Sequence, residues 1–149
     1  MKVKLLLGTV ILATVWMACS KDKYNTTPTI AFKNVNATEF SAGQVVTFNL
    51  EVTDKEGDIQ DTIFLQRISS ASCQDQSIVS AYQMPASPPQ KFLKADISLQ
   101  FSYRNPNPPL IQLEGCSQND DTAVFKFWIK DKAGHISDTV QAPPIVLLK

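Results

Sequence analysis

Three long segments of this chain alternate apolar and polar residues with a period of two, and this pattern constrains the fold more than any other feature. Each segment places one apolar row on a core and a mostly polar row toward solvent, which is typical of a half-buried β-strand. The segments are residues 45–53, 96–103 and 123–130. Their apolar rows, in chain order, are Val46, Phe48, Leu50 and Val52, then Ile97, Leu99, Phe101 and Tyr103, then Ala123, Phe125, Phe127 and Ile129.

The rest of the chain after residue 27 adds shorter strand candidates and no sustained helical period. Prolines cluster between the candidates and mark loops, because proline cannot donate a hydrogen bond within a central strand. About seven short strands separated by proline-containing loops predict an all-β fold, and specifically a β-sandwich. The shorter candidates are Thr29–Phe32, Thr62–Ile68, Ile78–Tyr82 and Ile145–Leu148.

An internal echo links two parts of the chain, since residues 48–63 match residues 125–140 in register. Each copy is predicted to form a strand, a turn of the form Asp-Lys-x-Gly and a second strand. The glycine supplies a positive φ at low cost, and the aspartate can accept hydrogen bonds from the turn amides. The turn residues are Asp54 and Gly57 in the first copy and Asp131 and Gly134 in the second.

Through this echo the chain resembles immunoglobulin-like and fibronectin type III-like domains of bacterial surface proteins. Many of these domains end with a strand, Asp-x-x-Gly and a final strand, as Ile129–Gly134 and the residues after it do. The resemblance implies an immunoglobulin-like β-sandwich over residues 28–149, with strands B and C in the first copy and strands F and G in the second. It also implies that the two copies are hairpins whose turns emerge at the same end of the sandwich.

The N-terminus carries Lys2 and Lys4, then the uncharged run Leu5–Ala18, and then Cys19. A basic start, an apolar run and a small residue before the break predict a secretory signal peptide, because a membrane span needs about 20 apolar residues. With Ala18 before the cysteine, the arrangement resembles a bacterial lipoprotein signal. The resemblance implies cleavage before Cys19, attachment of several acyl chains to Cys19 and anchoring in the bacterial outer membrane.

A polar segment follows the cysteine and is expected to act as a flexible tether up to Pro28. Its charge mix resembles that of Bacteroidota lipoproteins, in which acidic residues at this place favour export to the cell surface. Asp22 is the only acidic residue here, so both a periplasm-facing and a surface-exposed domain stay open. The predicted organisation is a signal peptide over 1–18, the lipidated cysteine and tether over 19–27, and the domain over 28–149.

Cysteine usage supports the same compartment. With Cys19 assigned to lipid, Cys73 and Cys116 remain, and two thiols in an exported domain are most simply explained by one disulfide. In the chain-entropy view such a bridge stabilises the fold by about 4 kcal/mol. Two free buried thiols are the alternative. A metal site at these cysteines is disfavoured, because the chain has a single histidine.

The charge balance limits the partners. The chain has 14 basic and 14 acidic residues, and removal of the signal peptide takes away two lysines, so the mature domain is slightly acidic. No basic patch stands out, and nucleic acid is therefore not an expected partner. Membrane attachment is expected through the N-terminal lipid, with a protein or a glycan as the further partner.

The aspartates at the two turns are the best candidates for a functional site. If both turns lie at one end of the sandwich, carboxylates from both copies approach one another. Calcium takes about six to eight oxygen ligands, mainly carboxylates and carbonyls, so such a cluster predicts a calcium site. The alternative, which the sequence favours, is that these residues only form turns and that no cofactor is bound. The candidate ligands are Asp54, Asp58, Asp61, Asp131 and Asp138.

An enzymatic activity is not expected. His135 follows the glycine of a tight turn, where exposure is the usual outcome, and no Gly-x-Ser-x-Gly motif is present. Asp120 and Asp121 precede a strand and are expected to lie in a solvated loop rather than to act as paired catalytic acids.

Aromatic residues give a weaker indication of binding. Trp128 lies on the otherwise polar row of its strand, where its ring can stack on a sugar or fill a pocket of a partner protein. The alternative is that the proline-rich segment Arg104–Leu113 covers it. The predicted function is a membrane-anchored, non-enzymatic module for binding, adhesion or scaffolding. The alternative is a glycan-binding or calcium-dependent accessory domain of an outer-membrane uptake system, and a glycan binder is expected to show two or more coplanar exposed aromatic rings.

Overall fold

The computed structural model describes residues 25–73, 77–86, 88–105 and 110–149. The predicted signal peptide, the lipidation site Cys19 and most of the tether lie outside the described residues. Within the described ranges no helix is long and apolar enough to cross a membrane. The strands are β1 (Thr29–Val35), β2 (Glu39–Phe40), β3 (Val45–Asp54), β4 (Thr62–Ile68), β5 (Ser77–Gln83), β6 (Leu93–Tyr103), β7 (Ile111–Leu113), β8 (Asp121–Lys130), β9 (Val140–Gln141) and β10 (Ile145–Leu147).

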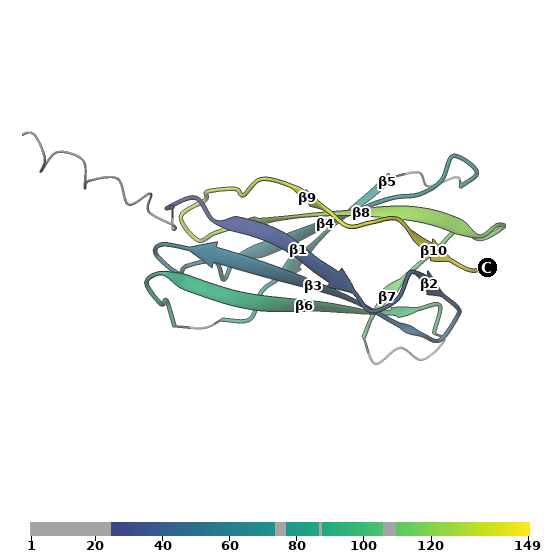
Figure 1. Cartoon of the computed structure of the whole chain (residues 1–149), viewed down its shortest axis with the longest axis horizontal. Coiled ribbons are helices and arrows are strands. Elements are labelled where there is room, and N and C mark those ends of the chain that lie inside the picture. The colour runs from purple at the N-terminus through teal and green to yellow at the C-terminus, as the bar shows by residue number, and fades with distance from the viewer. Residues whose placement is uncertain (1–24, 74–76, 87, 106–109) are drawn as a thin grey trace, which may run out of the picture.

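The strands form two sheets, which confirms the predicted all-β class (Figure 1). One sheet has the order β1-β3-β6-β7, and the other has the order β2-β10-β8-β4-β5 with β9 paired to β8. Both sheets are mixed, because β7 runs parallel to β6 and β2 runs parallel to β10 while the other pairs are antiparallel. The two sheets face each other in the manner of a β-sandwich.

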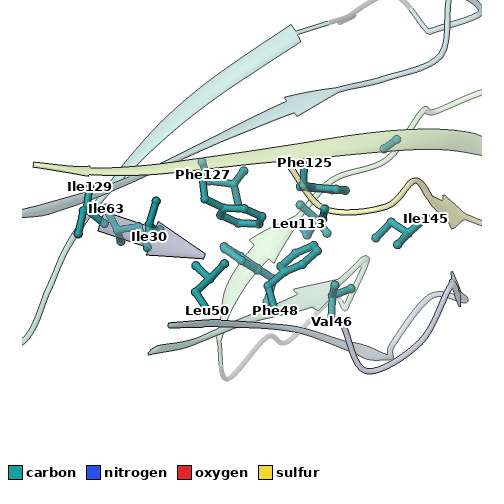
Figure 2. Close-up of a cluster of buried hydrophobic side chains, with 14 of the residues drawn as sticks. Ile30, Val46, Phe48, Leu50, Ile63, Leu113, Phe125, Phe127, Ile129 and Ile145 are labelled. Carbon is teal, nitrogen blue, oxygen red and sulfur yellow. The ribbon is translucent and has the colours of Figure 1, made fainter. Parts of the chain in front are cut away.

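The core lies between the sheets and consists of the apolar rows that the alternation predicted. Phe48 and Leu50 from β3 point toward Phe125 and Phe127 from β8, and all four side chains are fully buried (Figure 2). The ring centroid of Phe48 lies 4.9 Å from that of Phe125 and 5.1 Å from that of Phe127. Offset aromatic contacts of this kind add stability beyond the burial of area. The polar row of β3 faces outward, as predicted.

The number of strands differs from the prediction of about seven, since the described residues form ten. The sequence did not reveal β2 and β7, which have two and three residues. The strand predicted after the second turn is shorter than expected, because only Ile136 and the two residues of β9 pair with β8. A strand of that length shows no alternation, so its pairing depends on neighbours that are distant in sequence.

The first copy of the echo is not a hairpin, which corrects the prediction. Strand β3 pairs with β1 and β6 in one sheet, whereas β4 pairs with β5 and β8 in the other. The second copy does remain within one sheet, because β8 pairs with β9 and Lys130 forms a bridge with Ile136. The same turn sequence therefore joins two sheets in one place and folds back on its own strand in the other.

A disulfide links Cys73, which follows β4, to Cys116, which follows β7, as the sequence predicted. Their Cα atoms lie 5.4 Å apart. Since β4 and β7 belong to different sheets, the bridge ties the two sheets together. It lies beyond the end of β4 that is opposite to the Asp54 turn.

Candidate functional site

The turns of the two copies meet at one end of the sandwich, as predicted (Figure 1). The backbone N–H of Lys132 donates to the carbonyl oxygen of Asp58 at 3.0 Å, which joins the two turns directly. Asp54, Asp58 and Asp131 each place one carboxylate oxygen within 4.8 Å of the others. The five candidate ligands thus reduce to a triad, which we call the acidic triad.

Asp54 is the central member of the acidic triad. It ends β3 and is fully buried. Its Oδ2 accepts hydrogen bonds from the backbone N–H of Gly57 at 2.5 Å and of Asp58 at 3.3 Å, so the aspartate closes the turn as the sequence predicted. Its Oδ1 is buried and has no hydrogen-bond partner among the described residues. A buried carboxylate oxygen without a donor is costly, because water no longer solvates it.

The electrostatics of Asp54 reflect this burial. Loss of solvation raises the pKa of its carboxyl group above the usual aspartate value, and the nearby carboxylate of Asp58 raises it further. The turn amides of Gly57 and Asp58 act in the opposite direction, but burial dominates. Burial beside a second carboxylate therefore disfavours the charged form of Asp54, and no lysine or arginine among the described residues forms an ion pair with it.

Asp131 is also fully buried, but both of its oxygens have partners. Oδ1 accepts from the backbone N–H of His135 at 2.7 Å, and Oδ2 lies 2.9 Å from Nδ1 of the same residue. The His135 side chain is 47% exposed, so its ring is partly in solvent, as expected for a turn residue. It also holds one ligand of the acidic triad in place, which the sequence did not predict.

The remaining two candidates lie outside the acidic triad. Asp61 forms an ion pair with Lys130 at 3.2 Å and accepts a hydrogen bond from the Thr62 hydroxyl. Asp138 is exposed and lines a shallow cavity with Asn25 and other residues at the start of the domain. Both residues follow their turns by several positions, and their carboxylates do not join those of the acidic triad.

The acidic triad offers the carboxylate oxygen ligands that a hard divalent cation such as calcium prefers. Three carboxylates supply the charged part of a calcium shell, and backbone carbonyls and water supply the rest in such sites. The unpartnered Oδ1 of Asp54 is the feature that turn formation alone does not explain, because turn formation uses only Oδ2. A bound cation would give this oxygen a partner and would screen the three negative charges from one another.

The acidic triad also lies where the chain enters the domain. The backbone N–H of Lys55, beside Asp54, donates to the carbonyl oxygen of Asn25 at 3.1 Å. The carbonyl oxygen of Lys55 in turn accepts from the N–H of Phe92 at 2.9 Å. The β3–β4 turn therefore contacts both the first described residues and the loop before β6, and a cation here would hold three segments together.

One face of the Trp128 ring is covered by Phe64, whereas the sequence offered the proline-rich segment Arg104–Leu113 as the alternative cover. Trp128 stacks on Phe64 of β4, with ring centroids 5.2 Å apart and an angle of 5° between the planes. Both rings are partly exposed on the outer face of the sheet. The end of the segment Arg104–Leu113 forms β7, which pairs with β6 in the other sheet. The two rings cover one face of each other, so they differ from the coplanar pair expected of a glycan binder.

The expectation for Asp121 is wrong, although Asp120 is exposed as expected. Asp121 is fully buried because it is the first residue of the inward row of β8, in line with Ala123 and Phe125. Its Oδ1 accepts from the backbone N–H of Ser70 at 2.9 Å and so helps to fix the loop after β4.

One buried charged residue, Arg67, was not predicted from the sequence. Arg67 is 6% exposed and lies on the inward row of β4, in register with Ile63 and Leu65. The signal was present, because an arginine in the apolar register of a half-buried strand breaks the alternation.

Comparison with known proteins shows no family. No family model matches the sequence, and no curated protein matches it. Among solved structures, the sporulation control protein Spo0M from Bacillus subtilis is similar over 83% of this chain and 50% of that one, with 12% identity and a TM-score of 0.42. A β-glucosidase from Listeria innocua, solved with gluconolactone, is similar over 82% of this chain and 16% of that one, with 7% identity and a TM-score of 0.40. The chain thus spans half of the Spo0M chain and a smaller share of the glucosidase.

Proposed function

We propose that this protein is a lipid-anchored, non-enzymatic binding or scaffolding module of the bacterial outer membrane, in which a calcium ion at the acidic triad holds the turn end of the domain. The observation that carries the calcium part is the buried, unpartnered Oδ1 of Asp54 beside two further carboxylates. The lipid anchor is proposed from the sequence around Cys19.

The finer fold assignment is part of the same proposal. An immunoglobulin-like sandwich is supported by the path of the chain, which crosses from one sheet to the other between β3 and β4 and folds back within one sheet after β8. Modules of this kind present loops at their ends while the sandwich stays rigid. A rigid body on a short tether suits a role in which position and binding matter more than chemistry.

The calcium part is tested by thermal unfolding of the full chain in detergent, first in a chelator and then with added calcium. A single site that binds only the folded state adds about 2.7 kcal/mol to the unfolding free energy at a hundredfold excess over Kd. We expect a clear rise of Tm for the wild type and none for Asp54→Asn, which keeps an acceptor for the turn amides but loses the charge.

The matched control is Asp138→Asn, which removes an exposed aspartate near the same end but outside the acidic triad. This variant should respond to calcium as the wild type does. An unchanged Tm of the wild type at millimolar calcium would contradict the calcium part of the proposal. An equal loss of response in both variants would show a diffuse charge effect instead of a site.

The anchor is tested separately with Cys19→Ser. We expect this variant to leave the membrane fraction while its Tm stays that of the wild type, because the lipid and the folded domain are independent. Persistence of Cys19→Ser in the membrane pellet after a high-salt wash would overturn the lipid-anchor proposal. Intact mass of the wild type, with acyl mass on a chain that begins at Cys19, is the direct confirmation.

A further inference from the structure

The disulfide end of the domain holds a buried arginine that forms no ion pair with another described residue. Arg67 is 6% exposed, and its Nε is buried with no hydrogen-bond partner among the described residues. No carboxylate of the described chain lies within ion-pair distance of it. Arginine stays protonated in proteins, so it cannot lose its charge to escape burial. A buried charge in this position calls for an anion.

Two cavities meet at Arg67 and differ in character. The first, of about 100 Å³, is polar and is lined by Ser72, Ser117, Gln118 and the backbone around the Cys73–Cys116 bridge. A cavity holds a water molecule from about 10–15 Å³ upward, so this space admits a group of the size of a carboxylate. Among the described residues, Arg67 is the only charged side chain that lines it.

The second cavity, of about 140 Å³, is also lined by Arg67 and is the more apolar of the two. Its apolar side chains are Leu65, Ile78, Tyr82 and Leu113, and Ser80, Gln112 and Glu114 complete the lining. Ile78 remains 39% exposed at the edge strand β5, so the cavity opens to solvent there. An apolar substituent that enters from this edge would bury these side chains further, which is favourable in water.

We propose that Arg67 and the two cavities form a binding site for a small carboxylate that bears a short apolar substituent. The guanidinium matches the planar carboxylate with two parallel hydrogen bonds. The hydroxyl and amide groups of the polar cavity donate hydrogen bonds to the remaining acceptor positions of the carboxylate, and the apolar cavity receives the hydrocarbon part. The site is independent of the acidic triad, which lies at the other end of β4.

Three neighbouring acidic or basic groups bear on this proposal. Glu114 lines the apolar cavity but is exposed, and Asp121 is buried with its Oδ2 unpartnered. Arg104 donates to the carbonyl oxygen of Cys116 and therefore already has a role in the loop. If Arg67 paired with Asp121 or Glu114 in solution, its removal would destabilise the ligand-free protein. If Arg67 has no internal ion pair and binds an added anion instead, its removal would not destabilise the ligand-free protein.

The experiment uses the full chain in detergent and follows the Nε–H resonance of Arg67 by NMR together with Tm. Butyrate is the probe, butyramide is its neutral counterpart of the same shape, and acetate lacks most of the hydrocarbon part. We expect butyrate to shift the Arg67 resonance, butyramide to leave it unchanged and acetate to bind more weakly. Arg67→Met should weaken butyrate binding by about tenfold or more, as loss of a charged hydrogen-bond pair does.

Lys91→Met is the control, because Lys91 is an exposed cation that lines neither cavity, and this variant should bind butyrate like the wild type. The ligand-free Tm of Arg67→Met should equal or exceed that of the wild type, and a large fall would show an internal ion pair and overturn the proposal. Equal binding by Arg67→Met and wild type would overturn it as well. Response to inorganic phosphate but not to butyrate would replace the carboxylate by another anion and refute the stated ligand class.

Discussion

The two Asp-Lys-x-Gly turns share a sequence but differ in their surroundings, and the difference explains where the candidate site lies. At the position after the glycine the first copy has Asp58, whereas the second has His135. His135 donates to Asp131 from its backbone and contacts it with its ring, so that carboxylate is satisfied within its own turn. Asp54 has a second carboxylate at the equivalent place, and one of its oxygens stays without a partner.

The glycines of the two turns also differ in how closely other atoms pack around them. Gly57 and Gly134 both have positive φ, at 72° and 92°. Gly134 has no atom within 4 Å of the place where a Cβ would be, whereas at Gly57 a Cβ would overlap the backbone of Gln90. The first turn is packed under the loop before β6, and the second turn is open to solvent. One local sequence therefore forms one turn shape, while packing decides whether that turn is buried.

The largest expected effect is a loss of stability when the glycine of the first turn is replaced, compared with the same change in the second turn. Gly57→Ala adds a Cβ that overlaps the Gln90 backbone and also strains a positive φ, so we expect a loss of about 3 kcal/mol or more. Gly134→Ala meets only the conformational cost, which is about 1 kcal/mol. Chemical denaturation of both variants measures the difference. Equal losses would mean that the burial of the first turn is not as described.

A smaller effect is expected from converting the first turn into the second. Asp58→His removes one carboxylate of the acidic triad and places a donor beside Asp54, as His135 does beside Asp131. The variant should lose the calcium response, which is about 2.7 kcal/mol at a hundredfold excess over Kd. Chemical denaturation in chelator gives the stability of the variant without calcium, and the same measurement with added calcium gives its calcium response. An undiminished calcium response would show that Asp58 is not a ligand.

The smallest effect concerns pH in the absence of calcium. Burial raises the folded-state pKa of Asp54 above its ordinary value near 3.8, so the folded protein binds this proton more tightly than the unfolded chain does. The contribution of Asp54 to the unfolding free energy therefore falls as pH rises from that ordinary value through the raised one, and stays low above it. Subtraction of the Asp54→Asn profile isolates this contribution. A contribution that rises with pH over the same window would contradict the assigned burial.

Much of the fold was predictable because the alternation has a local cause. Strands β3 and β8 need one apolar row for a core, and their residues carry that requirement in the order of the sequence itself. The disulfide partners Cys73 and Cys116 were predicted because the assignment of Cys19 to lipid left only these two cysteines. The short strands β2 and β7 were not predictable, because a pair or triplet of residues adopts strand geometry only when a distant neighbour offers hydrogen bonds.

The candidate sites also have one part that the sequence predicted and one part that depends on the tertiary structure. The sequence by itself determined that both turns have the same form, with an aspartate that caps turn amides and a glycine with positive φ. Only the tertiary structure decided that Asp54, Asp58 and Asp131 meet while Asp61 and Asp138 do not, because β3 and β4 lie in different sheets and the turn between them lies against the second copy. It also decided that the inward-facing Arg67 lines two cavities. Sequence periodicity assigns a side chain to a face, but the charges and cavities opposite that face come from strands distant in the chain.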